Sequence, residues 1–249
     1  MNDGVHRERV IGDENCRTAI IMTHGIMGSP TTLAPLIEET GQGFRIENLL
    51  LPGHGGSAAD FARSGMREWQ RYLDDRVAAA SARHERVILV GHSMGCLLSV
   101  RSALSYPDRV VGLFLLAAPL RMRPLARYIQ NCLCSGLALC GQDPGVAAAS
   151  AATSVSDRNP LAYIPTAPRY IELFRKADET RGLLDRLDVP VRAVISLRDE
   201  IVSPRSAEEL RRIPGADVLL LRESGHFLYT DGELPLIRRS FRRLLDTRG

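Results

Sequence analysis

One short stretch of the chain constrains its fold more than any other. Residues 87–90 are aliphatic throughout, which is typical of a strand buried on both faces. Shortly afterwards, over residues 96–104, apolar side chains recur at helical spacing. The chain must therefore turn sharply between strand and helix, and Gly91 and Gly95 permit this because glycine has no Cβ. Ser93 lies at the tip of the turn, where we expect a strained backbone and an accessible hydroxyl.

This strand, turn and helix resemble the G-x-S-x-G nucleophile elbow of the α/β-hydrolase superfamily, here G-H-S-M-G at residues 91–95. A second predicted strand, residues 18–23, runs into H-G-I-M-G at residues 24–28, where the superfamily carries an HG motif. The resemblance implies that the backbone N–H groups of Ile26 and Met94 form an oxyanion hole. Such donors stabilise the negative charge that develops on a carbonyl oxygen under attack.

Two histidines near these motifs are expected to be structural. His24 opens the HG motif and is expected to brace the loop rather than to carry a proton. His54 lies in L-P-G-H-G, after a predicted strand at residues 44–51, and is expected to bond the local backbone. After the HG loop, a helix is expected to begin near Thr31 or Thr32, because their hydroxyls can cap it.

Two later segments resemble the acid and histidine loops of the superfamily. Asp199 follows a predicted strand at residues 191–197 and matches D-x-x-V, with Glu200 as the neighbouring alternative. His226 lies in S-G-H-F after a predicted strand at residues 217–221. The order Ser93, Asp199, His226 is that of the hydrolase fold. The resemblance implies a triad in which His226 takes the Ser93 proton and Asp199 fixes the imidazole.

The remaining pattern predicts one large α/β unit with an insertion. A further strand is expected at residues 110–116 and helices at residues 67–82 and 233–246, which gives a doubly wound, mostly parallel sheet. The last helix is expected to cover the sheet with its apolar face rather than to lie on a membrane.

Between residues 120 and 186 the strand pattern disappears and prolines punctuate the chain. The resemblance implies a small helical cap, or lid, at residues 120–186, inserted after the sixth strand of the fold. Residues 1–119 and 187–249 then form the α/β-hydrolase core domain. Helical pieces are expected at residues 125–139, 144–152 and 168–187. The first carries an apolar face that either packs on the core or forms a wall for an acyl or alkyl group.

Composition excludes several other classes of protein. Basic and acidic residues number 32 and 29, which argues against a nucleic-acid partner. Five cysteines, Cys16, Cys96, Cys132, Cys134 and Cys140, show no paired C-x-x-C spacing, so we expect no disulfide framework, no metal and reduced thiols in a cytoplasmic protein. An apolar leader is absent and no stretch approaches the ~20 apolar residues of a membrane span, so stable membrane insertion is not expected.

Within the superfamily, a serine elbow argues against dehalogenases and epoxide hydrolases, whose nucleophile is aspartate. The H-G-I-M-G loop and compact cap resemble bacterial carboxylesterases and monoglyceride lipases. This resemblance implies a serine hydrolase that needs no cofactor and cleaves small-molecule carboxylic esters with short to medium acyl chains, monoacylglycerols among the candidates. Alternatives are a thioesterase or acyltransferase with the same triad, a peptidase, a C–C bond hydrolase, or a non-catalytic hydrolase-fold binding protein. The sequence leaves the natural substrate and the oligomeric state open.

Overall fold

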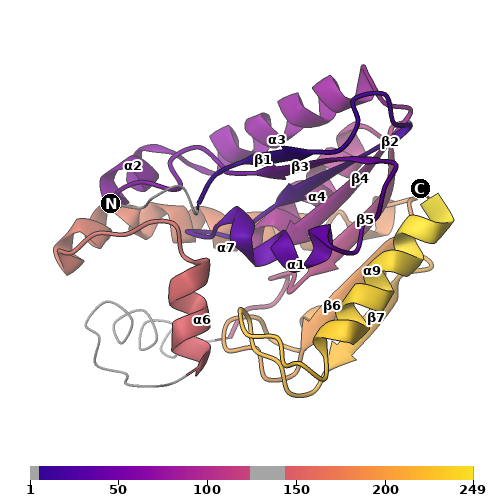
Figure 1. Ribbon diagram of the computed structural model, residues 1–249. Helices are drawn as coiled ribbons and strands as arrows, with labels where there is room; N and C mark the ends of the chain where they lie inside the picture. Colours follow the sequence, from indigo (N-terminus) through magenta and orange to yellow (C-terminus); the bar gives the residue numbers. More distant parts are fainter. Residues whose placement is uncertain (1–5, 124–143, 249) are drawn as a thin grey trace.

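A computed structural model describes residues 6–123 and 144–248 of the chain. Within them, seven strands form one sheet in the order β1-β3-β2-β4-β5-β6-β7 (Figure 1). The strands are β1 (Arg9–Ile11), β2 (Thr18–Thr23), β3 (Phe44–Leu49), β4 (Arg86–His92), β5 (Val110–Leu116), β6 (Val191–Ser196) and β7 (Asp217–Leu221). Every neighbouring pair is parallel except β1 and β3, which confirms the predicted mostly parallel, doubly wound sheet. The antiparallel edge strand β1 was not predicted.

From β2 onward, helices connect successive strands, and they cover both faces of the sheet. They are η1 (Pro30–Leu33), α1 (Ala34–Ile37), α2 (Ala58–Arg63), α3 (Met66–Ser81), α4 (Met94–Ser105), α6 (Pro144–Ala152), η2 (Pro160–Thr166), α7 (Ala167–Arg181), η3 (Leu184–Arg186), α8 (Ser206–Leu210) and α9 (Leu234–Arg248), where η marks a 3₁₀-helix. The predicted helices at 67–82 and 233–246 are thus confirmed as α3 and α9, whereas the short helices α2 and α8 were not predicted.

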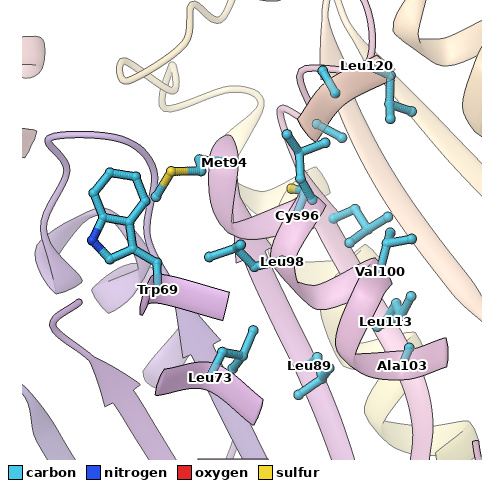
Figure 2. Packing of buried hydrophobic residues seen from close by; sticks show 14 of the residues in the cluster. Trp69, Leu73, Leu89, Met94, Cys96, Leu98, Val100, Ala103, Leu113 and Leu120 are labelled. Carbon is cyan, nitrogen blue, oxygen red and sulfur yellow. The ribbon is translucent and has the colours of Figure 1, made fainter. Parts of the chain in front are cut away.

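Alternate residues of the central strands point to opposite faces and build two separate cores. Ile88 of β4 packs in one core with Phe241 of α9, and Leu89 packs in the other with residues of α3 and α4. Figure 2 shows the second core, in which Trp69 of α3 lies near Met94 of α4. Because Phe241 is fully buried, α9 covers the sheet, as predicted.

The first helical turn begins earlier than predicted. Ser29, rather than Thr31 or Thr32, is the N-cap of η1, and its hydroxyl accepts a hydrogen bond from the Thr31 N–H at 3.2 Å. Pro30 explains the difference, because proline has no N–H to satisfy and its fixed φ suits the first position of a helix.

The described part of the segment between β5 and β6 contains the helices α6, η2, α7 and η3, joined by irregular stretches. The helix predicted at 144–152 is confirmed as α6, and the one predicted at 168–187 forms α7 followed by the single turn η3. The helix expected at 125–139 lies outside the described residues, together with Cys132, Cys134 and Cys140. The insertion follows β5, the strand predicted at residues 110–116 and the fifth described strand in chain order. Helix α7 packs against α3 and α4, and η2 packs against α2.

None of the described helices combines the length and apolar character needed to cross a membrane. Over the same residues, no group of three histidine, cysteine, aspartate or glutamate side chains is arranged to hold a metal ion. Cys16 and Cys96 are both unpaired thiols.

Candidate active site

Ser93 occupies the sharp turn between β4 and α4. Its φ of 53° and ψ of −122° are strained for a residue with a side chain. The two flanking glycines are required by close packing: a Cβ on Gly95 would lie 2.0 Å from the Thr23 carbonyl oxygen, and one on Gly91 would lie 2.5 Å from the Cys96 nitrogen. The physical reason inferred from the sequence for these glycines is therefore confirmed.

Asp199 and His226 form a buried pair. The Nδ1 atom of His226 lies 2.8 Å from Oδ2 of Asp199, and each residue is only 1% exposed. The second carboxylate oxygen of Asp199 accepts hydrogen bonds from the N–H groups of Ile201 at 2.8 Å and Val202 at 2.7 Å. These backbone donors explain the D-x-x-V spacing, because their hydrogen bonds orient the carboxylate.

Glu200, the alternative acid, has a different partner. Its Oε2 accepts a hydrogen bond from the main-chain N–H of His226 at 3.0 Å, while the imidazole bonds to Asp199. The carboxylate that contacts the ring is thus Asp199, which the D-x-x-V motif favoured over Glu200.

The charges around His226 favour its protonated form. Burial lowers the pKa of His226, but the charge and hydrogen bond of Asp199, together with the charge of Glu200, outweigh burial and leave the pKa raised above its usual value of 6.5. An imidazole in this setting can accept a proton and hold it as a stabilised cation, which is what a general base requires.

Hydrogen bonds fix the peptide group of the HG loop that carries the Ile26 N–H. The Leu51 N–H donates to Nε2 of His24 at 3.1 Å, so the ring proton is on Nδ1, which donates to the Gly25 carbonyl oxygen at 2.8 Å. The Gly28 N–H donates to the same oxygen at 3.0 Å. Because a trans peptide is planar, fixing this carbonyl directs the Ile26 N–H the opposite way. His24 thus braces the loop, as predicted.

The second expected donor is Met94, the first residue of α4. Its N–H has no acceptor in a preceding helical turn and lies at the positive end of the helix dipole. The HG loop runs directly against the elbow, since a Cβ on Gly25 would lie 2.9 Å from Cβ of Ser93 and 3.3 Å from its hydroxyl oxygen. Both candidate donors therefore belong to segments that border Ser93.

Ser93 and His226 line the same small pocket, of about 40 Å³, together with Gly25 and Ile26. The charged residues Arg123 and Glu200 also line it. Its apolar wall consists of Pro119, Met122, Tyr170, Leu173, Phe174, Ile201 and Phe227. Ser93 is only 5% exposed, so the hydroxyl that was expected to be accessible is largely buried, in a pocket lined by side chains of other segments. Among the described hydrogen bonds, none joins this hydroxyl to the imidazole. A larger open groove of about 610 Å³, formed by α3, α4 and α7, contains none of the predicted site residues.

His54 lies away from this pocket, in an aromatic cluster. Its ring centroid is 5.0 Å from that of Phe61 and 5.3 Å from that of Trp69, with His24 at 4.7 Å. Burial lowers the pKa of His54 to about 4, so the ring is neutral near pH 7. This placement agrees with the structural role predicted for His54.

Sequence reasoning missed a serine that connects the insertion to the HG loop. Ser154 is fully buried; its N–H donates to the Met27 carbonyl at 2.9 Å and its hydroxyl donates to that of Gly28. The same hydroxyl accepts from the Gly55 N–H at 3.1 Å. A serine among alanines and other serines carries no pattern that would single it out, so only the tertiary structure could identify it.

The fold and site can be compared with known proteins. The Alpha/beta hydrolase family matches residues 20–234 of the chain. Among curated proteins, the thermostable monoacylglycerol lipase of Bacillus sp. (strain H-257) is 25% identical over 231 residues, which cover 90% of this chain and 88% of the relative.

Solved structures give the same picture of the fold. One reported for the metagenome-derived lipolytic enzymes LipS and LipT aligns with a TM-score of 0.74 at 22% identity, covering 98% of this chain and 99% of the other. The monoacylglycerol lipase of Paleococcus ferrophilus aligns with a TM-score of 0.69 at 20% identity, covering 97% and 98%. At these identities the structural likeness establishes the shared fold.

Proposed function

The chain belongs to the α/β-hydrolase family, and on that basis we propose that it is a serine hydrolase that cleaves carboxylic esters through an acyl-enzyme on Ser93. The observation that carries the proposal is the buried Asp199–His226 pair, whose imidazole lines the same pocket as the strained elbow serine. A hydroxyl, a base and an acid that orients the base are the three parts that such chemistry needs.

The reaction proceeds in two half-reactions. His226 takes the hydroxyl proton as Ser93 Oγ bonds to the ester carbonyl carbon, and the N–H groups of Ile26 and Met94 stabilise the resulting oxyanion. The intermediate collapses, and the alcohol leaves with the proton from His226. Water then attacks the acyl-enzyme while His226 takes its proton, and the carboxylic acid departs as Ser93 regains its hydrogen. Asp199 holds the imidazole and stabilises its cation throughout.

We assign residues 120–186 to a cap over the core formed by residues 1–119 and 187–249. Support comes from α7, because Tyr170, Leu173 and Phe174 contribute to the apolar wall of the Ser93 pocket. A small pocket with such a wall favours esters of short to medium acyl chains. The two relatives named as monoacylglycerol lipases make monoacylglycerols candidate substrates. Unpaired Cys16 and Cys96 favour a cytoplasmic location.

The test is turnover of p-nitrophenyl esters from acetate to decanoate, of monoacylglycerols and of acyl thioesters. Wild type is expected to hydrolyse the shorter oxygen esters fastest, and Ser93→Ala to lose turnover. Ser105→Ala, a matched change at an exposed serine of α4, should retain wild-type rates. Faster thioester cleavage would instead identify a thioesterase. A folded wild type that binds esters without turning them over would identify a binding protein and refute the proposal.

A further inference from the structure

The main chain of His226 is held on both sides by side chains that neighbour the other two proposed triad members. Its N–H donates to Oε2 of Glu200 at 3.0 Å, and Glu200 directly follows Asp199. Its carbonyl oxygen lies 3.1 Å from Nε2 of His92, which directly precedes Ser93. The loop that carries His226 is therefore tied to the acid loop and to the nucleophile elbow through residues outside the triad.

His92 is suited to hold the carbonyl. It is fully buried, and burial followed by the charge of His226 lowers its pKa to about 3, so the ring is neutral near pH 7. A carbonyl can only accept, so the single ring proton is on Nε2. The ring also packs against His226, at a centroid distance of 4.9 Å, and against Phe227 at 5.7 Å. Tyr229 adds a second donor to the same carbonyl, at 3.3 Å.

Glu200 is fitted closely to the opposite side of the loop. A Cβ on Gly225 would lie 2.9 Å from Oε2 of Glu200, so the glycine of S-G-H leaves the space that this carboxylate occupies. The Glu200 charge also acts on the imidazole and contributes to raising the pKa of His226. Glu200 thus supplies both an acceptor for the main chain and a second negative charge near the ring.

These two contacts matter for the position of His226 because the loop around it lacks regular secondary structure. Residues 222–229 form neither helix nor strand, so no ladder fixes the His226 peptide groups. A shift of the backbone would carry the ring with it. Misplacing a reacting group by about 1 Å can cost about a hundredfold in rate. Asp199 restrains only the Nδ1 side of the ring, so the backbone needs its own restraints.

We propose that His92 and Glu200 are positioning residues that clamp the His226 main chain, so that its imidazole stays aligned between Asp199 and Ser93. The inference rests on the proposed function, because alignment matters only if His226 is the base. It assigns separate tasks to two adjacent carboxylates: Asp199 orients the ring and Glu200 holds the backbone. It also gives the second residue of the G-H-S-M-G motif a task distinct from that of the serine.

The experiment compares isosteric and disruptive variants at each position. Glu200→Gln keeps an acceptor oxygen without the charge, and Glu200→Leu removes both. His92→Gln retains an N–H donor that can reach the carbonyl, and His92→Leu removes it. Glu208→Gln, at an exposed site on α8, is the matched control. We measure kcat and KM for p-nitrophenyl butyrate, together with the NMR titration of the His226 ring and the hydrogen exchange of its amide.

The two leucine variants should lower kcat by about tenfold or more, and the two glutamine variants should recover most of the rate. KM should change by less than about twofold in His92→Leu, because His92 does not line the pocket. Glu200→Gln should also lower the titration midpoint of His226, because the charge is lost while Asp199 and His92 still face the ring. The His226 amide should exchange quickly in Glu200→Leu and remain protected in Glu200→Gln.

The proposal is overturned if both leucine variants keep kcat and amide protection close to wild type, or if glutamine rescues neither position. If His92→Leu does not fold, the comparison of Glu200→Leu with Glu200→Gln tests the proposal by itself. Amide exchange and ring titration need no substrate. A wild type without esterase activity would therefore refute the proposed function while the clamp itself is still tested.

Discussion

His226 and Asp199 are joined by a contact of 2.8 Å between Nδ1 and Oδ2, in surroundings that leave each residue only 1% exposed. Water cannot replace either partner there, so the imidazole tautomer and orientation depend on this one carboxylate. The acid loop contributes two backbone donors to the other carboxylate oxygen, which hold the Asp199 side chain in place.

Replacing Asp199 by Asn should abolish most activity without displacing the loop. The amide can donate to Nδ1 and so favours the wrong tautomer, which in triads of this type lowers kcat by about 10⁴. Steady-state kinetics on a p-nitrophenyl ester measures the effect, with Glu208→Gln as a control for loss of an exposed carboxylate. A loss smaller than tenfold would show that Asp199 is not the orienting acid.

Gly25→Ala should damage catalysis more than stability. The new Cβ would lie 2.9 Å from Cβ of Ser93 and must push the HG loop away from the elbow. Removing one oxyanion donor costs about 10² to 10³ in kcat, and we expect a loss of that order. Gly232→Ala is the matched control, since a Cβ there meets no atom within 4 Å. Equal kcat in both variants would contradict an oxyanion role for this loop.

Activity should rise with pH, with a midpoint above 6.5. His226 must be neutral to accept the Ser93 proton, and Asp199 and Glu200 hold its pKa above that value despite burial. The profile of kcat/KM from pH 5 to 9 measures this midpoint in the free enzyme. A midpoint below 6.5 would contradict the electrostatic description of the site.

Stability should fall as the pH drops below 6.5. Burial lowers the pKa of His54 to about 4 and of His92 to about 3, and that of His24 is also well below 6.5. As the pH falls, these histidines therefore bind protons in the unfolded chain before they do so in the folded chain. For His54 alone this should lower the free energy of unfolding by about 3 kcal/mol at pH 4. His226 has the opposite effect, because its pKa is higher in the folded chain than in the unfolded chain. Its contribution to the free energy of unfolding is fully present below pH 6.5 and is lost as the pH rises through the pKa of the folded state.

Urea unfolding at pH 7.0, 5.5 and 4.5 measures how the free energy of unfolding depends on pH. His54→Phe removes one titrating group from the aromatic cluster and should flatten the loss between pH 7.0 and 4.5, whatever its effect at pH 7.0. An unchanged slope in His54→Phe would show that this ring is not buried in its neutral form.

Ser154→Ala should destabilise the fold. The hydroxyl serves both the Gly28 carbonyl and the Gly55 N–H, and losing it leaves two backbone groups without that partner. Such groups cost about 1–3 kcal/mol when buried. Urea unfolding against Ser150→Ala, an exposed serine of α6, measures the difference. Equal stability of the two variants would exclude Ser154 as a link between insertion and core.

The sequence alone could predict those parts of the fold and site whose structure is determined by residues close together in the chain. The apolar runs in β4 and β5 and the glycines around Ser93 each carry their structural reason within a few residues, so strand, elbow and helix follow directly. Asp199 was recognisable because its D-x-x-V spacing reflects bonds to its own loop. The edge strand β1 has only three exposed residues and no apolar alternation to reveal it.

The contacts that sequence could not supply join distant segments. His92 and Glu200 reach His226 across 134 and 26 residues, and Ser154 reaches Gly28 across 126. The neighbouring sequence gives no sign of these contacts. His92 occupies a variable position of the G-x-S-x-G motif, Glu200 looks like a second acid beside Asp199, and Ser154 looks like any loop serine. Their tasks appear only once the parallel sheet brings the ends of β4, β6 and β7 to one edge.

The most direct test of the account is the site of covalent modification by a fluorophosphonate, which reacts with a serine only when its hydroxyl is activated. Peptide mass spectrometry of the labelled protein should locate one adduct, on Ser93, and His226→Ala should prevent its formation. An adduct on another serine, or none on folded wild type, would contradict the claim that this elbow serine is an activated nucleophile.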